Sequence, residues 1–198
     1  APNSIVGCGI EMAPEAEWSG VKAKYELPDE YVLYLGRVSK AKVDKLLPYF
    51  LRCKAKYGGD AKLVLVGGFE NEIRKFDSPD ILFTGYVSDE EKTAIVRHAT
   101  VMVNPSPMES LSLLMLEGMQ SRIPLLVNGR SKVMKDHCRL SGAGLWYNNG
   151  RDFRKKLHRL LSDPELRRTM SEKGPAYVRE HYDWEIIIPK LRTLIESI

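Results

Sequence analysis

The chain has 198 residues, 43% of them apolar, and a formal net charge of +4. This length fits one large domain or one half of a larger enzyme, and no apolar run is long enough to cross a membrane. Basic and acidic residues are mixed along the chain, so we expect no nucleic-acid partner; the small positive excess suits a phosphorylated ligand or an anionic membrane surface. Three cysteines (Cys8, Cys53 and Cys138) lack metal-site spacing. Together with the absence of a signal peptide at the start, this predicts a reduced, cytoplasmic protein.

Residues 1–30 have no clear period and contain four glycines or prolines by position 14. We therefore predict an entry or interdomain segment over residues 1–30, followed by one domain over residues 31–198. Six apolar runs in this domain are typical of buried strands. They cover residues 31–36, 62–68, 80–85, 100–104, 123–128 and 143–148.

Helical patterns separate and follow these runs. Residues 43–57 place apolar side chains on one face, and Ser88 with Glu91 predicts a capping box for the next helix. Ser162 and Pro164 predict the start of another helix. The chain is expected to end in three helices, over residues 151–161, 164–180 and 184–197.

Strands that are apolar on both faces and alternate with helices indicate a parallel sheet covered on both sides. The predicted fold is therefore α/β, a three-layer Rossmann-like domain with about six strands and a helical C-terminal end. Ligands bind such a sheet at the carboxyl ends of its strands, where glycine lets the backbone approach them closely. The residues at these ends are Gly36-Arg37, Gly67-Gly68, Gly85 to Val87, Asn104 to Glu109, and Asn128 to Arg130.

The junction after the fourth run is the most informative. Glu109 and Glu117 occur there with seven residues between them, and helix formers begin at Leu111. With Ser110 as the N-cap, Glu109 lies just outside the positive end of the helix, and Glu117 lies about two turns, roughly 10 Å, further along. The free amides of Ser110, Leu111 and Ser112 would lie between the two carboxylates and could bind a phosphate.

Basic residues follow the first strand. Arg37 and Lys42 could together stabilise a diphosphate leaving group without a metal. A plainer interpretation is that Lys40, Lys42 and Lys45 only solvate the start of a helix, although basic residues there oppose the helix dipole and so suggest a bound anion. The two glutamates also have a plain interpretation, as solvated side chains.

The pair of glutamates inside PSPMESLSLLMLEGM (105–119) is the specific part of a wider match. The other matching segments are PNSIVGCGIEM (2–12), GRVSKAK (36–42), LVLVGG (63–68), ILFTGYVS (81–88) and HYDWEIIIPKLRTLIE (181–196). Over these segments, which span nearly the whole chain, the protein resembles the C-terminal, nucleotide-sugar-binding domain of glycosyltransferase family 4. Enzymes of that family have two Rossmann-like domains in the GT-B fold.

The resemblance implies a role for each matching residue. Arg37 and Lys42 match the family's diphosphate-binding pair, and Glu109 matches the glutamate that contacts the donor sugar; these three are the implied catalytic residues. Glu117 matches the glutamate that binds the ribose hydroxyls. The other implied donor-binding positions are Gly36 at the first junction, Tyr86 and Val87 beside the base, and the amides of Ser110, Leu111 and Ser112 at the distal phosphate.

The resemblance also implies the reaction. The chain would be the donor-binding domain of a retaining glycosyltransferase that moves a hexose from a UDP-, GDP- or ADP-sugar to a glycan or lipid-linked acceptor. No cofactor or metal is expected, and the chain has no Asp-x-Asp pair to hold a divalent ion. The family's acceptor site and catalytic histidine lie in an N-terminal domain that is absent here, so the chain alone is expected to be inactive. The implied setting is polysaccharide assembly at the inner face of the cytoplasmic membrane, with peripheral membrane association.

Other classes stay open. A non-catalytic nucleotide-sugar-binding module would carry the same residues, and a related sugar-nucleotide enzyme of the GT-B fold would share the architecture. A nicotinamide-dependent dehydrogenase would need a third glycine beside Gly67-Gly68 and an acid about 20 residues further on, which this chain lacks.

Some positions depart from the family or have plain interpretations. Ser112 stands where glycine is common, and Gly118 stands where alanine is usual. His98 is expected to cap the end of a helix, and Trp18 is expected to be a packing residue.

Overall fold

The computed structural model describes residues 7–70 and 78–196 and contains one parallel sheet. The strand order is β3-β2-β1-β4-β5-β6, and all five neighbouring pairs are parallel. The six predicted strands and the predicted fold class are therefore confirmed. The strands are β1 (Tyr31–Leu35), β2 (Lys62–Val66), β3 (Ile81–Gly85), β4 (Val101–Asn104), β5 (Leu125–Asn128) and β6 (Gly144–Tyr147).

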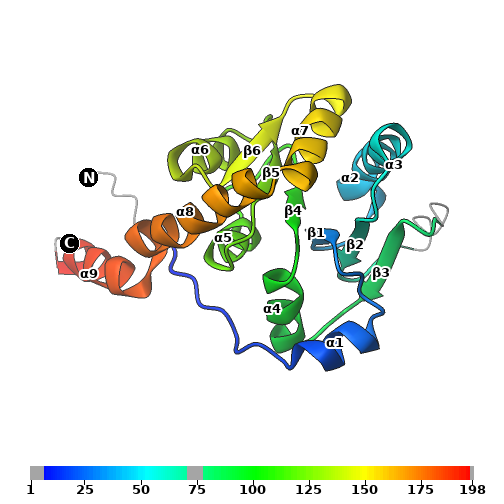
Figure 1. Ribbon diagram of the computed structural model, residues 1–198. Helices are drawn as coiled ribbons and strands as arrows, with labels where there is room; N and C mark the ends of the chain where they lie inside the picture. The colour runs from blue at the N-terminus through cyan, green and yellow to red at the C-terminus, as the bar shows by residue number, and fades with distance from the viewer. Residues whose placement is uncertain (1–6, 71–77, 197–198) are drawn as a thin grey trace.

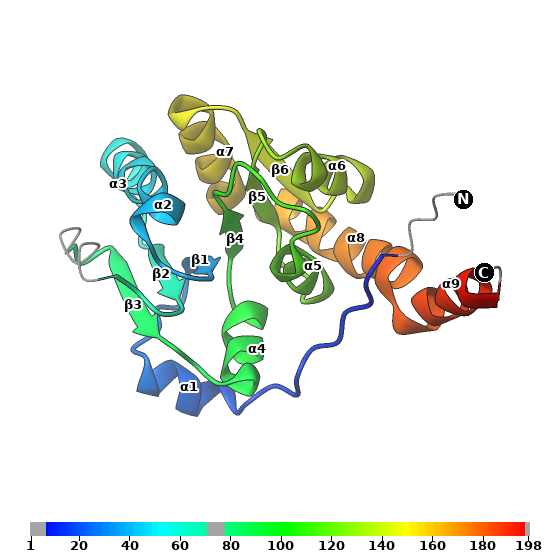
Figure 2. The same cartoon turned by 180° about the vertical axis from the view of Figure 1, so that it is seen from behind.

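Helices cover both faces of the sheet, and the last of them, α9, extends beyond it on the side opposite to α3 (Figures 1 and 2). Within the described residues, no helix combines the length and the apolar content needed to cross a bilayer. The helices are α1 (Trp18–Lys24), α2 (Lys40–Val43), α3 (Leu46–Tyr57), α4 (Asp89–Arg97), α5 (Leu113–Gln120), α6 (Lys132–Ser141), α7 (Gly150–Ser162), α8 (Pro164–Tyr182) and α9 (Trp184–Glu196).

Side chains alternate along each strand between two cores. In β1, Tyr31 and Leu33 belong to the core shared with α4, α5 and α6, whereas Val32 and Tyr34 belong to the core shared with α3 and α7. All five residues of β1 are buried. A strand whose two faces are both buried needs apolar residues at every position, which explains the continuous apolar runs of the sequence.

One predicted helix start and one predicted helix cap are wrong, each for a local reason, whereas the predicted start of α8 at residue 164 is confirmed. The predicted helix over residues 43–57 is divided into α2 and α3, because Pro48 has no amide to continue a helix from Asp44 and instead lies in the first turn of α3. The N-cap of α8 is Asp163 and not Ser162; the Asp163 carboxylate accepts a hydrogen bond from the Leu166 amide at 2.9 Å. The capping box of Ser88 and Glu91 is confirmed in α4.

The segment over residues 1–30 contains a helix that the sequence analysis missed. In α1, Trp18 stacks on the ring of His98 with the ring centroids 3.9 Å apart, and His98 is the C-cap of α4 as expected. Glu91 of α4 accepts hydrogen bonds from Lys24 at 2.6 Å and from the Tyr25 hydroxyl at 2.9 Å. This part of the segment therefore packs as an element of the domain.

We predict a pH-dependent contribution of Glu91 to stability. The Lys24 ammonium, followed by the Ser88 amide, lowers the pKa of Glu91 from 4.5 to about 2. A lowered pKa stabilises the fold above the unfolded-state value, and the contribution is lost as the pH falls through the folded-state value. Replacing Glu91 by Gln should therefore lower the free energy of unfolding by about 1 kcal/mol at pH 7, and this difference should shrink between pH 4.5 and pH 2.

Urea unfolding across this pH range measures the effect. Glu90→Gln is the matched control, because Glu90 lies in the same helical turn and is exposed. A Glu91→Gln deficit that stays constant from pH 7 to pH 2 would contradict the assigned pairing.

Helix α8 crosses α5 at Gly174. A Cβ atom at this position would lie 2.5 Å from the Met119 carbonyl oxygen of α5, so only glycine allows the two backbones to approach this closely. Met170, Tyr177 and Val178 complete the buried stripe of α8.

We predict that Gly174→Ala destabilises the protein by about 1–3 kcal/mol, because overpacking outweighs the helix propensity of about 1 kcal/mol that alanine adds. Chemical denaturation monitored by circular dichroism measures this change. Thr169→Ala on the exposed side of α8 is the control and should be near neutral. A stabilising Gly174→Ala would show that α5 and α8 can separate without cost.

Candidate ligand-binding site

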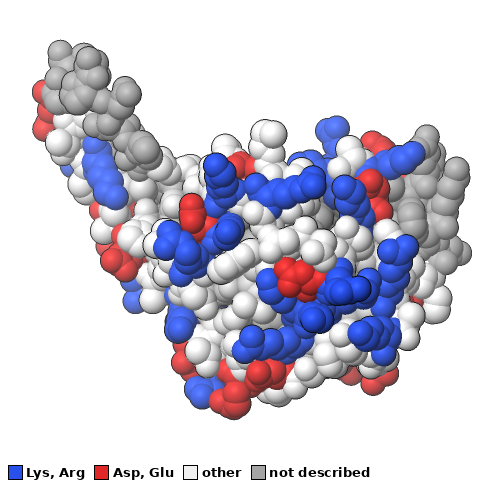
Figure 3. All heavy atoms as spheres, turned by 90° about the horizontal axis from the view of Figure 1, so that it is seen from above, with Lys and Arg blue, Asp and Glu red and all other residues white. Residues whose placement is uncertain are grey.

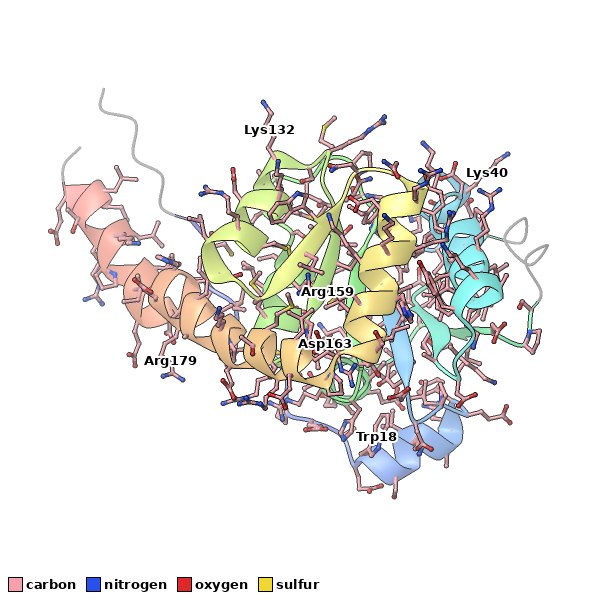
Figure 4. All side chains as sticks on the ribbon, turned by 45° about the horizontal axis from the view of Figure 1, so that its top comes forward. Trp18, Lys40, Lys132, Arg159, Asp163 and Arg179 are labelled. Carbon is pink, nitrogen blue, oxygen red and sulfur yellow. The ribbon has the colours of Figure 1, made fainter. Side chains whose placement is uncertain are left out.

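The central cavity lies at the carboxyl ends of β1 and β4, where the order of the strands reverses. At such a switch point the chain leaves neighbouring strands toward opposite faces of the sheet, which opens a crevice. Figure 4 shows Lys40 and Lys132, which follow β1 and β5, at one end of the molecule, and Asp163 and Trp18 toward the other. Figure 3 looks more directly onto the end of the molecule that carries Lys40 and Lys132. Lys and Arg side chains cover more of this face than Asp and Glu side chains do.

This cavity has a volume of about 500 Å³ and contains most of the predicted site residues. A second cavity of about 520 Å³ lies beside it, above β2 and β3, and Arg37 lines both. Tyr86 lines the second cavity, whereas Val87 packs against the core and Glu117 lines neither cavity. The predicted residues in the central cavity are Gly36, Arg37, Lys42, Glu109, Ser110, Leu111 and Ser112.

Helix α5 begins at Leu113, two residues later than predicted. Its N-cap is Ser112 and not Ser110, and Ser112 has a left-handed backbone with φ of 64°. Among the described residues, the amides from Ser110 to Leu114 donate no hydrogen bond. This row of free amides at the positive end of α5 favours an anion, so the shifted helix start lengthens the predicted amide cradle.

Asn104, which the sequence analysis placed at this junction without assigning it a role, holds the loop in place. Its amide nitrogen donates to the Ser112 hydroxyl at 3.0 Å, and its side-chain oxygen accepts from the Ser106 amide at 3.0 Å. Both bonds start from the last residue of β4, so the sheet fixes the loop that carries the free amides. No local pattern reveals a bond between residues eight positions apart.

Glu109 and Lys42 face each other across the central cavity, with their charged atoms 3.9 Å apart. Both side chains are partly exposed, at 26% and 48%, so their attraction is weak and their charges are available to a ligand. Tyr34 lies below them and donates to the Arg37 carbonyl oxygen at 3.0 Å. Burial, and secondly the Glu109 carboxylate, raise the pKa of Tyr34 to about 12, so this phenol stays neutral.

Glycines let the loops after β1, β2 and β3 approach one another. A Cβ atom at Gly67 would lie 2.3 Å from the Gly36 carbonyl oxygen, and Gly67 has φ of 130°. A Cβ atom at Gly68 would lie 2.5 Å from the Tyr86 hydroxyl. Tyr86 is 86% exposed, so its ring can form one wall of a binding surface.

Glu117 and Lys92 form a partly buried pair between α5 and α4. The Lys92 ammonium lies 3.4 Å from Glu117 Oε1, and the two side chains are 24% and 14% exposed. Burial lowers the pKa of Lys92, but the carboxylates of Glu117 and Asp89 outweigh it and raise the pKa overall. Among the described residues, Glu117 Oε2 is the one buried side-chain oxygen or nitrogen without a hydrogen-bond partner. The sequence analysis missed Lys92, because the contact depends on how two helices pack.

The His, Cys, Asp and Glu residues of the described part of the chain do not cluster into a metal site. Over residues 7–70 and 78–196 there is no group of three or more His, Cys, Asp or Glu residues that could hold a metal ion. His137 is buried and bonds to the Tyr177 hydroxyl at 2.8 Å, so its imidazole has a structural partner.

We predict that Asn104 and Ser112 are energetically coupled. Asn104→Ala should lower the free energy of unfolding by about 1–2 kcal/mol, because two hydrogen bonds are lost. In a protein that already carries Ser112→Gly, the loss should be smaller by about 1 kcal/mol, since one of those bonds is already absent and glycine accepts a positive φ without strain.

A double-mutant cycle by urea unfolding measures this coupling. Asn148→Ala is the control, because its exposed side chain forms no hydrogen bond in the described structure. If the changes in the free energy of unfolding caused by Asn104→Ala and Ser112→Gly add strictly, the hydrogen bond between Asn104 and Ser112 does not have the proposed role.

Comparisons with known proteins agree with this geometry. Residues 20–177 match the sequence model of the family described as glycosyl transferases group 1. The alpha-D-kanosaminyltransferase of Streptomyces kanamyceticus is 30% identical over 174 residues, which cover 81% of this chain and 44% of that protein. This chain spans less than half the length of the curated relatives that it matches.

Two solved structures show the same fold. The Anabaena protein HepE, determined in complex with UDP-glucose, has a TM-score of 0.76 at 12% identity, over 93% of this chain and 54% of its own. The C-terminal domain of the group 1 family protein LpcC from Francisella tularensis has a TM-score of 0.71 at 19% identity. That match covers 86% of this chain and 95% of the LpcC domain, so the described fold is that of one GT-B half.

Proposed function

The chain belongs to the group 1 glycosyl transferases, and we propose that it binds the nucleotide-diphosphate sugar that donates the glycosyl group. The observation that carries this proposal is the row of free amides from Ser110 to Leu114, which lines one cavity together with Arg37, Lys42 and Glu109. Amides at the positive end of a helix favour an anion such as a diphosphate. The proposal assigns the ribose hydroxyls to Glu117 on the same helix, whose Oε1 lies 3.4 Å from the Lys92 ammonium.

The other contacts follow the carboxyl edge of the sheet. The base lies beside Tyr86 and Val87, and the diphosphate lies near the free amides that begin at Ser110, where Arg37 and Lys42 neutralise its charge. The donor sugar lies at Glu109, next to Lys42. Two cavities that share Arg37 support this extended arrangement, and the UDP-glucose complex of the Anabaena neighbour supports the ligand class.

In the proposed reaction the sugar–diphosphate bond breaks while an acceptor hydroxyl attacks the anomeric carbon and gives its proton to the departing diphosphate. Negative charge grows on the departing diphosphate, where Arg37, Lys42 and the positive end of α5 are already oriented. Removing one pre-organised charge partner of this kind costs about 3 kcal/mol, or roughly 100-fold in rate. The Glu109 carboxylate holds the sugar hydroxyls through its two acceptor oxygens.

The finer parts of the proposal extend the family resemblance. The transferred group is a hexose, its anomeric configuration is retained, no metal takes part, and a separate N-terminal domain supplies the acceptor site. The acceptor is a glycan or lipid-linked sugar at the inner face of the cytoplasmic membrane. Three free cysteines, two of them buried, support a reducing compartment.

We predict that replacing Glu117 by Gln weakens binding of the cognate nucleoside diphosphate about 10- to 100-fold, because a charge-assisted hydrogen bond worth about 1.5–3 kcal/mol is replaced by a weaker one. Titration of the chain with UDP, GDP, ADP and NAD, read by thermal shift and calorimetry, measures this effect and identifies the base. Glu180→Gln is the matched control, because Glu180 is an exposed glutamate on α8, outside the cavities described above.

Each outcome has a clear meaning. Equal nucleotide affinity in the Glu117→Gln protein would remove the ribose role of Glu117. Binding of NAD with no response to any nucleoside diphosphate would overturn the donor-binding proposal.

A further inference from the structure

A third cavity lies beyond β4, β5 and β6 and takes no part in the proposed donor site, apart from Lys42 and Pro105, which it shares with the central cavity. Its volume is about 330 Å³, within the range of small-ligand sites. It is lined by Asn128 and Arg130, two residues of the junction that the sequence pattern marked and the proposed function leaves unused. The other lining residues used below are Asp44, Lys45, Tyr147 and Asn149.

The walls of this cavity are held by interactions between the strand ends. The Asn128 side chain donates to the Pro105 carbonyl oxygen at 2.9 Å and accepts from the Arg130 amide at 3.1 Å, which joins the loops after β4 and β5. The Gly129 amide donates to the Tyr147 carbonyl oxygen at 2.8 Å. A Cβ atom at Gly129 would lie 2.8 Å from the Asn148 side-chain oxygen, so glycine permits this approach. The cavity is therefore pre-formed.

The lining offers hydrogen-bond donors that lack acceptors. Tyr147 is 4% exposed, and its hydroxyl has no hydrogen-bond partner among the described residues. In the same described part of the chain, the charged ends of Lys45 and Arg130 form no ion pair. The Asn149 side-chain oxygen caps α7, which leaves its amide nitrogen available. Asp44 is the one carboxylate among the lining residues.

We infer that this third cavity is a second anion site, which binds the phosphate or carboxylate group of an anionic sugar. Only an acceptor-rich ligand can satisfy cations, a phenol and carboxamides at once, and an oxyanion is the richest acceptor available. The positive end of α7, which begins directly after Asn149, adds to the attraction. The Tyr147 side chain lines the cavity, belongs to a residue that is 4% exposed, and has a hydroxyl without a partner among the described residues. It is the observation, independent of that helix end, that points to a ligand.

The position suggests what the anionic sugar does, and this part of the inference rests on the proposed function. Lys42 lines both the central and the third cavity, and its ammonium lies 3.9 Å from Glu109, where the donor sugar is proposed to lie. A ligand in the third cavity is therefore a neighbour of the reacting centre. The phosphate or carboxylate of an acceptor would be held there by its charge, while the proposed N-terminal domain supplies the rest of the acceptor site.

The test separates the third cavity from the donor cavities. Glucose 6-phosphate, inorganic phosphate and glucose are titrated into the chain and followed by amide chemical shifts. We expect glucose 6-phosphate to bind more tightly than either part alone, with the largest shifts at Gly129, Gly150 and Arg151. Arg130→Gln should weaken glucose 6-phosphate about tenfold, and Tyr147→Phe, which keeps the ring, should weaken it severalfold.

Matched variants give the opposing outcomes. Arg37→Gln should leave glucose 6-phosphate binding unchanged, and Arg159→Gln, an exposed arginine toward the end of α7, should do the same. Loss of binding in Arg37→Gln with no loss in Arg130→Gln would place the ligand in the donor cavities and overturn the inference. If Arg159→Gln weakens glucose 6-phosphate binding as much as Arg130→Gln does, the binding is a general attraction between charges and the second anion site is wrong. The absence of saturable glucose 6-phosphate binding would also overturn the inference.

The same samples distinguish this inference from the proposed function. Nucleoside diphosphate titrations of the Arg130→Gln protein should match those of the unaltered chain. If nucleotides fail to bind while glucose 6-phosphate still does, the donor proposal fails and the second anion site stands. If inorganic phosphate binds as tightly as glucose 6-phosphate, the site takes free phosphate, and the assignment to a sugar is wrong.

Discussion

The reversal of strand order between β1 and β4 is the constraint on which the rest of the site depends. After β1 the chain turns toward the core that contains Val43, and after β4 it turns toward the core that contains Met115. The crevice between β1 and β4 is therefore lined by residues of the loops that follow these strands. The basic residues after β1 and the free amides at the start of α5 therefore face each other because of topology.

A site of this kind tolerates little movement in the loop after β4. The amides of a flexible loop would reorient around a ligand and lose much of their advantage over water. Asn104 prevents this by bonding to Ser112, whose left-handed backbone costs about 1–2 kcal/mol relative to a right-handed one. Glycine, which is common at this position in the family, adopts the left-handed backbone without cost. Ser112 adopts it with the help of the hydrogen bond that ties its hydroxyl to the sheet.

The sequence predicts the sheet well because each strand is buried on both faces, and an apolar run such as residues 31–36 has few other stable places. It predicts Arg37, Lys42 and Glu109 because they lie in the segments that follow β1 and β4, and the structure brings these three residues to one cavity. It fails at the start of α5, where Asn104 decides the geometry from outside the helix. It also misses the partner of Glu117, since Lys92 comes from another helix and only tertiary packing brings the two together.

The half-paired carboxylate of Glu117 has an energetic consequence for the ligand-free protein. Burying an oxygen without a donor raises the free energy of the folded state before any ligand arrives. Under the proposed function, a ribose hydroxyl that reaches this oxygen after a movement of the covering side chains would relieve a cost that folding has already incurred. Substitutions that give this oxygen a permanent donor would then stabilise the ligand-free protein and remove that part of the binding free energy.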